Sequence, residues 1–318
     1  MTQQSIVFGE YHHLVGIVAH PQENSQPCND VAAIFVTAGM LHSAGPFRLH
    51  ADLADALCES NIRSLRFDLS GIGESLGVGT SGRSIDRAAH EISMAMNWLS
   101  ENFGTQKFIL FGLCSGADDS VQAAVNDDRV VGVVTLDGCG YRTPKYYLHR
   151  LWSHYARRLI MPSKWISLFR KLAGKKDLTA ASLQTGTDVR EFPAQAQAVT
   201  EFQLLVDRGV QMHFVYTGGV GEYYNHADQF FDMLSAVQWK QQATTEFYAD
   251  MDHVVRLCED REKLVVNLAS RIAAIASTHQ SVEVEAEQCT FELDTTAPQA
   301  TAPIVIPTPL SDTTALVS

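Results

Sequence analysis

Short apolar runs of strand length alternate with amphipathic stretches along most of the chain. A run that is apolar throughout is typical of a parallel strand that helices cover on both faces. The pattern predicts two short strands between residues 6 and 20, followed by strands at 31–37, 62–68, 107–113, 130–137, 210–216 and 245–250. Because helical stretches separate most of these runs, we expect an α/β fold with a mostly parallel sheet.

The clearest helix is predicted at 84–102, where apolar residues recur at helical spacing. Ser84 can cap its start and Gly104 can end it. Further helices are expected at 47–59, at 194–207, from about 226, and at 254–276. Helices this numerous predict cover on both faces of the sheet.

The alternation stops between residues 141 and 193. This stretch mixes aromatic and basic residues, shows no strand pattern, and is interpreted as a helical cap, a lid over an apolar pocket. Its basic residues would lie on the solvent face or near an acidic group of the substrate. From 278 to 318 the composition shifts to Thr, Ala, Pro and Val, which predicts a disordered tail. The expected core therefore comprises 1–140 and 194–277.

Composition narrows the class of function. The 318 residues are 46% hydrophobic, enough for a large core, and the formal net charge is −12. That acidity argues against nonspecific binding to nucleic acid or to an anionic membrane, and favours a small organic substrate. No apolar run approaches the roughly 18 residues of a membrane span, and the N-terminus does not resemble a secretory signal. The six scattered cysteines show no zinc-like spacing, so we expect reduced thiols in the cytoplasm and no metal.

One stretch combines strand, turn and helix signals around a potential nucleophile. The apolar strand that starts near Phe108 leads into Gly112-Leu-Cys-Ser-Gly116, and a helix follows. This is the pattern of a nucleophile elbow, with Cys114 in the position where serine is usual. A helix N-terminus lowers the pKa of a thiol and favours its ionised form. Two alternatives remain: Cys114 as a buried structural residue, and Ser115 as the nucleophile, which puts the glycine frame off by one residue.

Two backbone N–H groups are candidates for an oxyanion hole. One belongs to Ser115, in the first turn of the helix after the elbow. The other belongs to Met40, in the loop after the strand 31–37, where Gly39 permits a close approach. The glycine-rich turn at 71–73 lacks the third glycine of a dinucleotide fingerprint and no helix starts directly after it, so no cofactor is expected.

A general base and an orienting acid are predicted at the carboxyl ends of the last two strands. His253 follows the last strand, and Glu222 lies in the glycine-rich loop after the preceding one. In open parallel sheets these strand ends build the site. The chain order Cys114, Glu222, His253 is nucleophile, acid, histidine. Asp228 competes with Glu222 as the acid.

These segments together resemble the alpha/beta-hydrolase superfamily. The resemblance rests on Val31–Pro46, Arg66–Ser75, the Gly112–Gly116 pentapeptide and Asp252-His253. The sequence of these segments is similar to that of the hydrolases associated with exosortase systems, and the cysteine resembles that of dienelactone hydrolases. The resemblance covers about residues 5 to 277. It departs from the common pattern at Ala38-Gly39, where many members have His-Gly, and at the cysteine.

The resemblance implies an esterase- or thioesterase-like hydrolase that cleaves an ester, thioester or lactone of a small acyl substrate through an acyl-enzyme, without metal or cofactor. An acyl group on sulfur stays reactive toward other nucleophiles, so an acyltransferase that uses thioester donors is an alternative. A noncatalytic ligand-binding member of the fold is a second one. The oligomeric state is not predicted.

Overall fold

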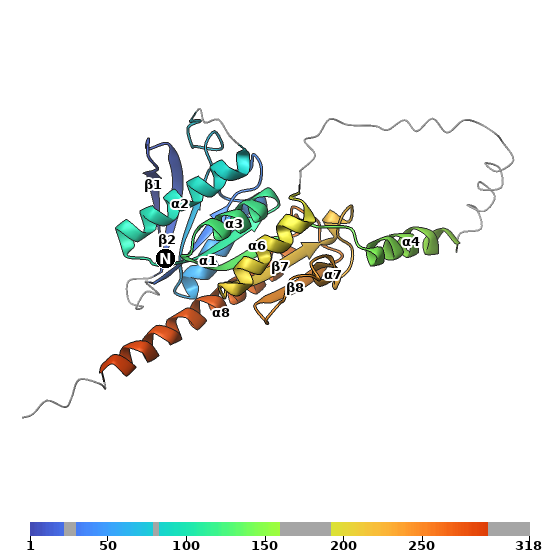
Figure 1. The fold of residues 1–318 in the computed structure, drawn as a ribbon. Helices are drawn as coiled ribbons and strands as arrows, with labels where there is room; N and C mark the ends of the chain where they lie inside the picture. The colour runs from blue at the N-terminus through green and yellow to red at the C-terminus, as the bar shows by residue number, and fades with distance from the viewer. Residues whose placement is uncertain (22–29, 79–82, 160–191, 292–318) are drawn as a thin grey trace, which may run out of the picture. The chain divides into compact units, whose positions relative to one another are not determined.

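The computed structural model describes residues 1–21, 30–78, 83–159 and 192–291. Residues 1–280 form one structural unit and 281–318 a second. Within the described part, the core of the first unit is an eight-stranded sheet in the order β1-β2-β4-β3-β5-β6-β7-β8 (Figure 1). Its strands are β1 Thr2–Phe8, β2 Leu14–His20, β3 Val31–Val36, β4 Arg63–Phe67, β5 Lys107–Leu113, β6 Val130–Leu136, β7 Gln211–Thr217 and β8 Ala243–Tyr248.

The sheet is parallel from β4 to β8. β1 pairs antiparallel with β2, which pairs antiparallel with β4, and every further neighbour in the order is parallel. The strands β3, β5 and β6 are buried almost throughout, as runs that are apolar on both faces require. The predicted α/β class with a mostly parallel sheet is confirmed.

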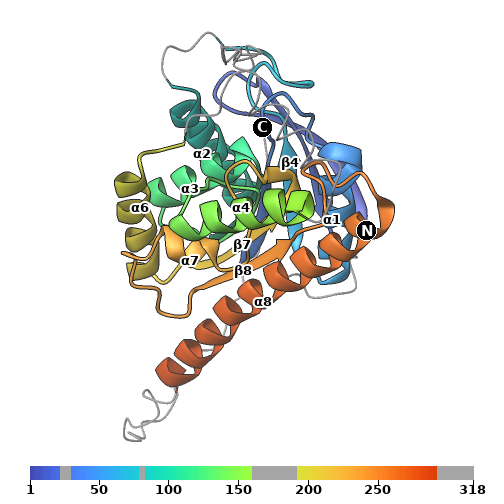
Figure 2. The same cartoon turned by 90° about the vertical axis from the view of Figure 1, so that its right-hand side faces the viewer.

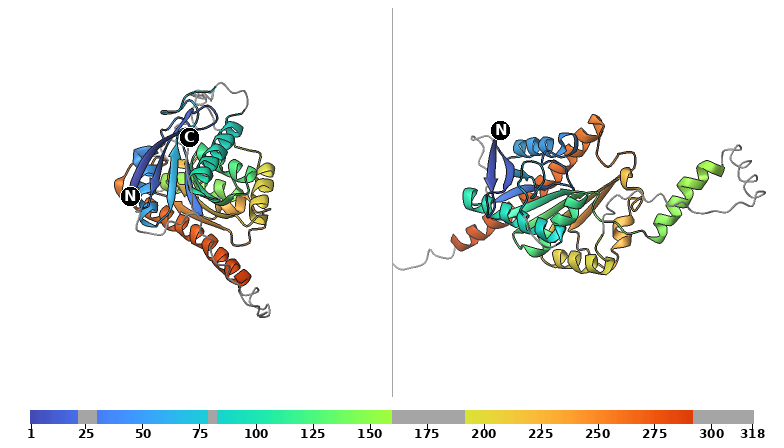
Figure 3. Two further views of the ribbon diagram at one scale, coloured as in Figure 1. Left: turned by 90° about the vertical axis from the view of Figure 1, so that its left-hand side faces the viewer. Right: turned by 90° about the horizontal axis from the view of Figure 1, so that it is seen from above.

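Helices cover the sheet on both faces, in two separate apolar cores. The helices α1 and α8 pack on one face, and α2, α3, α6 and α7 on the other (Figures 2 and 3). Neighbouring strand residues divide between the cores: Ile34 of β3 faces the second group and Phe35 the first. The helices are α1 Leu49–Glu59, α2 Ser84–Phe103, α3 Ser115–Asn126, α4 Pro144–Leu159, α6 Gln195–Asp207, α7 Gln229–Met233 and α8 Cys258–Phe291, with 3-10 turns at Pro46–Arg48 and Gly218–Val220.

Two predicted boundaries need correction, and a third is as predicted. Ser84 is the first residue of α2 rather than its cap, because Arg83 has the extended backbone of the N-cap. Gly104 ends α2 in the left-handed conformation, as predicted. α8 runs on to Phe291, beyond the expected start of a disordered tail at 278, through a stretch rich in the helix formers Glu, Gln and Ala.

Part of two predicted regions lies outside the described residues. Of the expected cap at 141–193, the structure describes α4 and its approach, while 160–191 lie outside the description. The remainder of the tail, 292–318, also lies outside it. Among the residues described, no helix has the length and apolarity needed to cross a membrane.

Among the described residues, four cysteines have placed side chains, and none of these four takes part in a disulfide. Cys58 and Cys139 are buried, Cys114 is half-buried and Cys258 is exposed. A reactive thiol needs access to its substrate, and Cys114 combines partial exposure with a position at the end of a central strand.

Candidate active site

Cys114 occupies a sharp turn between β5 and α3. Its backbone has φ 55° and ψ −119°, a conformation that a residue with a side chain adopts only under strain. The flanking glycines make the turn possible: a Cβ on Gly112 would collide with the carbonyl of Gly116. A Cβ on Gly116 would lie 2.5 Å from the carbonyl oxygen of Val36. The predicted elbow geometry and the reason for its glycines are therefore confirmed.

His253 lies beside the elbow and bonds on both sides of its ring. It follows β8 and its Nδ1 is 2.7 Å from Oδ2 of Asp137. The side chain of Cys114 is its other hydrogen-bond partner. The hydrogen bond to Asp137 has the largest effect and that to Cys114 the next largest. Together they raise the pKa of His253 from 6.5 to about 10, although burial lowers it. Such an imidazole is protonated at neutral pH and lies against the sulfur, an arrangement that favours the thiolate.

Asp137 is the carboxylate that contacts His253, and hydrogen bonds hold it on both oxygens. It directly follows β6, is fully buried, and has φ 53°, a left-handed conformation that Asp tolerates better than most residues. Its Oδ1 accepts a hydrogen bond from the Thr217 backbone N–H at 2.7 Å. Its Oδ2 accepts one from the Thr217 hydroxyl, also at 2.7 Å. The end of β7 thus fixes the carboxylate that faces His253.

The structure corrects the predicted acid. Glu222 is exposed, and the contacts of its carbonyl oxygen tie it to Arg142 and Tyr146. Asp228 is also exposed, at the start of α7. Neither carboxylate is a partner of His253 in the hydrogen bonds of the described residues.

The glycines after β7 misled the prediction because they serve the backbone. A Cβ on Gly219 would collide with the backbone N of His253, and the Gly219 N–H donates to the carbonyl of Met251 at 3.2 Å. This turn therefore packs against the loop that carries His253 and is hydrogen-bonded to it. The signal that could have found the acid is an Asp directly after the strand 130–136, next to the elbow strand.

The predicted oxyanion loop lies against the elbow. The backbone N–H of Gly39 donates to the hydroxyl of Ser115 at 2.8 Å, which ties the loop after β3 to the first turn of α3. Gly39 has φ 52°, and the Met40 side chain is 93% exposed. The structure thus brings the Met40 and Ser115 segments together. The hydroxyl of Ser115 is an acceptor for the loop.

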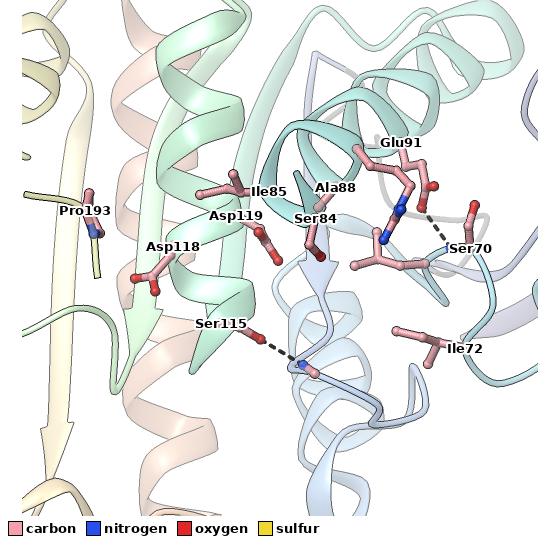
Figure 4. A pocket seen from close by; sticks show the side chains of 13 residues that line it. Ser70, Ile72, Ser84, Ile85, Ala88, Glu91, Ser115, Asp118, Asp119 and Pro193 are labelled. Atoms are coloured by element: carbon pink, nitrogen blue, oxygen red, sulfur yellow. Dashed lines mark hydrogen bonds between the residues drawn. The ribbon is translucent and has the colours of Figure 1, made fainter. Parts of the chain in front are cut away.

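A pocket of about 220 Å³ opens beside Gly39 and Ser115 (Figure 4). Asp118 and Asp119 of α3 point toward it, and Ser84 and Ile85 of α2 form the facing wall. A second pocket of about 400 Å³ shares Ser84, Ile85, Asp118 and Pro193 with the first. It continues between α2, α3 and α6 over apolar residues that include Val121, Phe192 and Phe202. The two pockets together form a groove that adjoins the elbow at Ser115, while Cys114 and His253 are not part of its lining.

One histidine of the sheet lies buried within a strand. His213 is buried in β7 and its Nδ1 is 2.8 Å from the Thr244 hydroxyl. Burial lowers its pKa to about 4, so the ring is neutral at neutral pH. Within the described part of the chain, no group of three or more His, Cys, Asp or Glu side chains is arranged to hold a metal ion.

Comparison with solved structures identifies the architecture. The alpha/beta hydrolase GrgF from Penicillium sp. sh18 superposes with a TM-score of 0.53 at 14% identity, over 87% of this chain and all of that one. An esterase from Pyrococcus furiosus gives 0.52 at 10% identity, over 85% and 90% of the two chains. Proline iminopeptidase from Mycobacterium smegmatis gives 0.51 at 14%, over 87% and 100%. The chain has the alpha/beta-hydrolase fold. No family model and no curated protein sequence matches it.

The three side chains of the site follow three different strands of this fold. Cys114, Asp137 and His253 follow β5, β6 and β8, all at the carboxyl edge of the sheet. The order nucleophile, acid, histidine is the one used by hydrolases of this fold. At 10–14% identity the likeness establishes the fold alone, and the chemistry is argued from these residues.

Proposed function

We propose that the protein is a hydrolase of small acyl esters, thioesters or lactones, with Cys114 as its nucleophile. The observation that carries the proposal is the imidazole of His253, held between Asp137 at 2.7 Å and the Cys114 side chain. A thiol paired with a steadied imidazole is the arrangement that nucleophilic acyl transfer requires. Asp137 replaces Glu222 as the orienting acid in this proposal.

The first half of the reaction forms an acyl-enzyme. His253 holds the proton of the Cys114 thiol, and the thiolate attacks the carbonyl carbon of the substrate. The backbone N–H groups of Ser115 and Met40 stabilise the oxyanion of the tetrahedral intermediate. When the bond to the leaving group breaks, His253 gives its proton to the departing oxygen or sulfur. Asp137 stabilises the imidazolium throughout and holds the Nδ1–H tautomer in place.

The second half releases the acid. Water attacks the thioester carbon while His253 takes its proton, and the intermediate collapses with loss of the Cys114 thiolate, which recovers the proton. The released product is a carboxylic acid. Because a thioester also reacts with alcohols and amines, an acceptor that enters the groove before water yields acyl transfer instead. A thiol nucleophile needs reducing conditions, which supports the proposed cytoplasmic setting.

The test is turnover of a panel of activated esters and acyl thioesters by the wild-type protein and by C114A, C114S and S115A. We expect C114A to lose turnover and the wild type to carry the acyl mass on Cys114 in intact-protein mass spectrometry. An alcohol or amine added as acceptor distinguishes hydrolysis from transfer by the product formed. Turnover that survives in C114A and disappears in S115A would assign the nucleophile to Ser115. Binding of a substrate analogue without turnover by any variant would indicate a noncatalytic member of the fold.

A further inference from the structure

The first turns of α4 are held against the body by one face of the helix. Tyr146 is fully buried, and its hydroxyl donates to the carbonyl oxygens of Gly221 and Glu222, the former at 3.1 Å. The ring of His149 stacks on that of His226, with 4.8 Å between centroids. These contacts orient α4 relative to the loop after β7.

The opposite face of α4 carries a stripe of large apolar side chains. Tyr147, Leu148, Leu151 and Trp152 are exposed, by 56%, 64%, 56% and 76%. Their spacing of three and four residues places them side by side on one face of a helix, away from Tyr146 and His149. We call these four residues the docking stripe. A contiguous exposed apolar surface of this kind marks an interaction site more often than a random patch.

The charge around the docking stripe differs from that of the whole chain. Five of the 24 Lys and Arg residues lie between Gly138 and Leu159, where α4 ends, and this stretch contains none of the 36 Asp and Glu residues. One of the five, Lys145, pairs with Asp232 at 2.8 Å. The chain as a whole has a net charge of −12. A locally basic segment can therefore bind an anionic surface that the rest of the protein would avoid.

We propose that α4 docks the protein onto an anionic lipid bilayer through the docking stripe. Trp, Tyr and Leu on one helix face, within a basic segment, is the composition of helices that lie in the interface of a membrane. A second copy of the chain is a poorer occupant. In a symmetric pairing of two stripes, two basic segments would face each other and repel.

Docking would place the candidate active site near the bilayer. α4 starts seven residues after Asp137, and its buried face contacts the loop whose Gly219 packs on the His253 backbone. If the proposed acyl hydrolysis holds, substrates that partition into the bilayer, or whose products leave it, are the class this position serves. The docking itself does not depend on catalysis.

The test is flotation of the full-length protein with vesicles of phosphatidylcholine alone and of phosphatidylcholine mixed with phosphatidylglycerol. We expect binding to the mixed vesicles, weakened by salt, and little binding to the neutral ones. The double variant L151E/W152E, and L148E as a second one, should lower the partition by about tenfold or more. V266E is the matched control, because Val266 is an equally exposed apolar residue on α8. C114A should bind like the wild type, which separates docking from catalysis.

Several outcomes would overturn the proposal. Equal flotation with neutral vesicles would show that charge does not drive the binding. No flotation with either kind of vesicle would show that the stripe does not dock onto a bilayer. An equal loss in V266E would show that any added charge has the same effect. A dimer in analytical ultracentrifugation that L151E/W152E separates would assign the stripe to a second copy. Thermal melts check that the variants stay folded, as substitutions of exposed side chains should.

Discussion

Replacing Asp137 with Asn tests the corrected acid most directly. The carboxylate accepts hydrogen bonds from the Thr217 N–H, the Thr217 hydroxyl and His253. In D137N the amide oxygen must face the Thr217 N–H, because that buried donor has a fixed position. The amide NH2 then faces the hydroxyl, which can turn from donor to acceptor, and Nδ1 of His253. The imidazole is forced to carry its proton on Nε2, the wrong nitrogen for the proposed proton transfer.

The expected effect on rate is large and that on folding small. A reversed imidazole tautomer costs about 1,000- to 10,000-fold in turnover, which is about 4 to 5.5 kcal/mol of transition-state stabilisation. The fold keeps two bonds to Thr217 and loses a charge-assisted one, a cost of about 1 to 3 kcal/mol. Asn also tolerates the left-handed backbone at this position. The pKa of His253 should fall as its main partner loses its charge.

Two quantities are measured in each variant and in the wild type: kcat/KM on an activated ester, and the pH dependence of Cys114 alkylation by iodoacetamide. D137N should lower the first and shift the alkylation profile to higher pH, because the imidazolium that favours the thiolate is lost. E222Q and D228N are matched controls, since both remove an exposed carboxylate, and both should stay within about twofold of the wild type. A loss in E222Q as large as that in D137N, or a folded D137N with normal turnover, would refute the assignment.

Three further predictions concern the elbow, its loop and the effect of pH. S115A removes the acceptor of the Gly39 N–H, so turnover should fall about tenfold while the acyl group still appears on Cys114 in mass spectra. G116A should lower the free energy of unfolding in urea by about 2 kcal/mol or more, because its Cβ meets the carbonyls of Val36 and Thr37. G77A, whose Cβ has only ordinary contacts, is the control, and an equal loss there would contradict the reasoning. His253 has a raised pKa of about 10, so its contribution to stability should be complete below about pH 6.5 and lost as the pH rises toward 10. D137N should flatten that dependence in thermal melts, and an unchanged slope would count against the ion pair.

The sequence predicted the parts of the fold that depend on local pattern. The buried parallel strands are continuous apolar runs, and the elbow needs glycine on both sides of one residue, so both are readable from the chain. His253 follows from its place after the last strand. These features require only the order of elements and the fact that the carboxyl ends of parallel strands share an edge.

The acid could not be chosen in this way, because two neighbouring strands both end near a carboxylate. What separates Asp137 from Glu222 is the register of β6 on β7, where Leu136 pairs with Val215 and Thr217 reaches the Asp137 carboxylate. The role of the glycines after β7 was equally hidden, since close backbone approach and loop flexibility look alike in a sequence. The exposed face of α4 depends on which side Tyr146 buries, a tertiary contact.

Because the proposed acid, Asp137, follows β6, the segment that follows β7 has a different role. Gly219 supports the histidine loop, and two residues further on the carbonyls of Gly221 and Glu222 receive the Tyr146 hydroxyl. The helix that this segment anchors can therefore be lengthened, shortened or replaced beyond Gly219, while the contacts of His253 stay the same. The proposed reaction and the surroundings of the site thus depend on different segments, and α4 is the place where an engineer could graft a different helix.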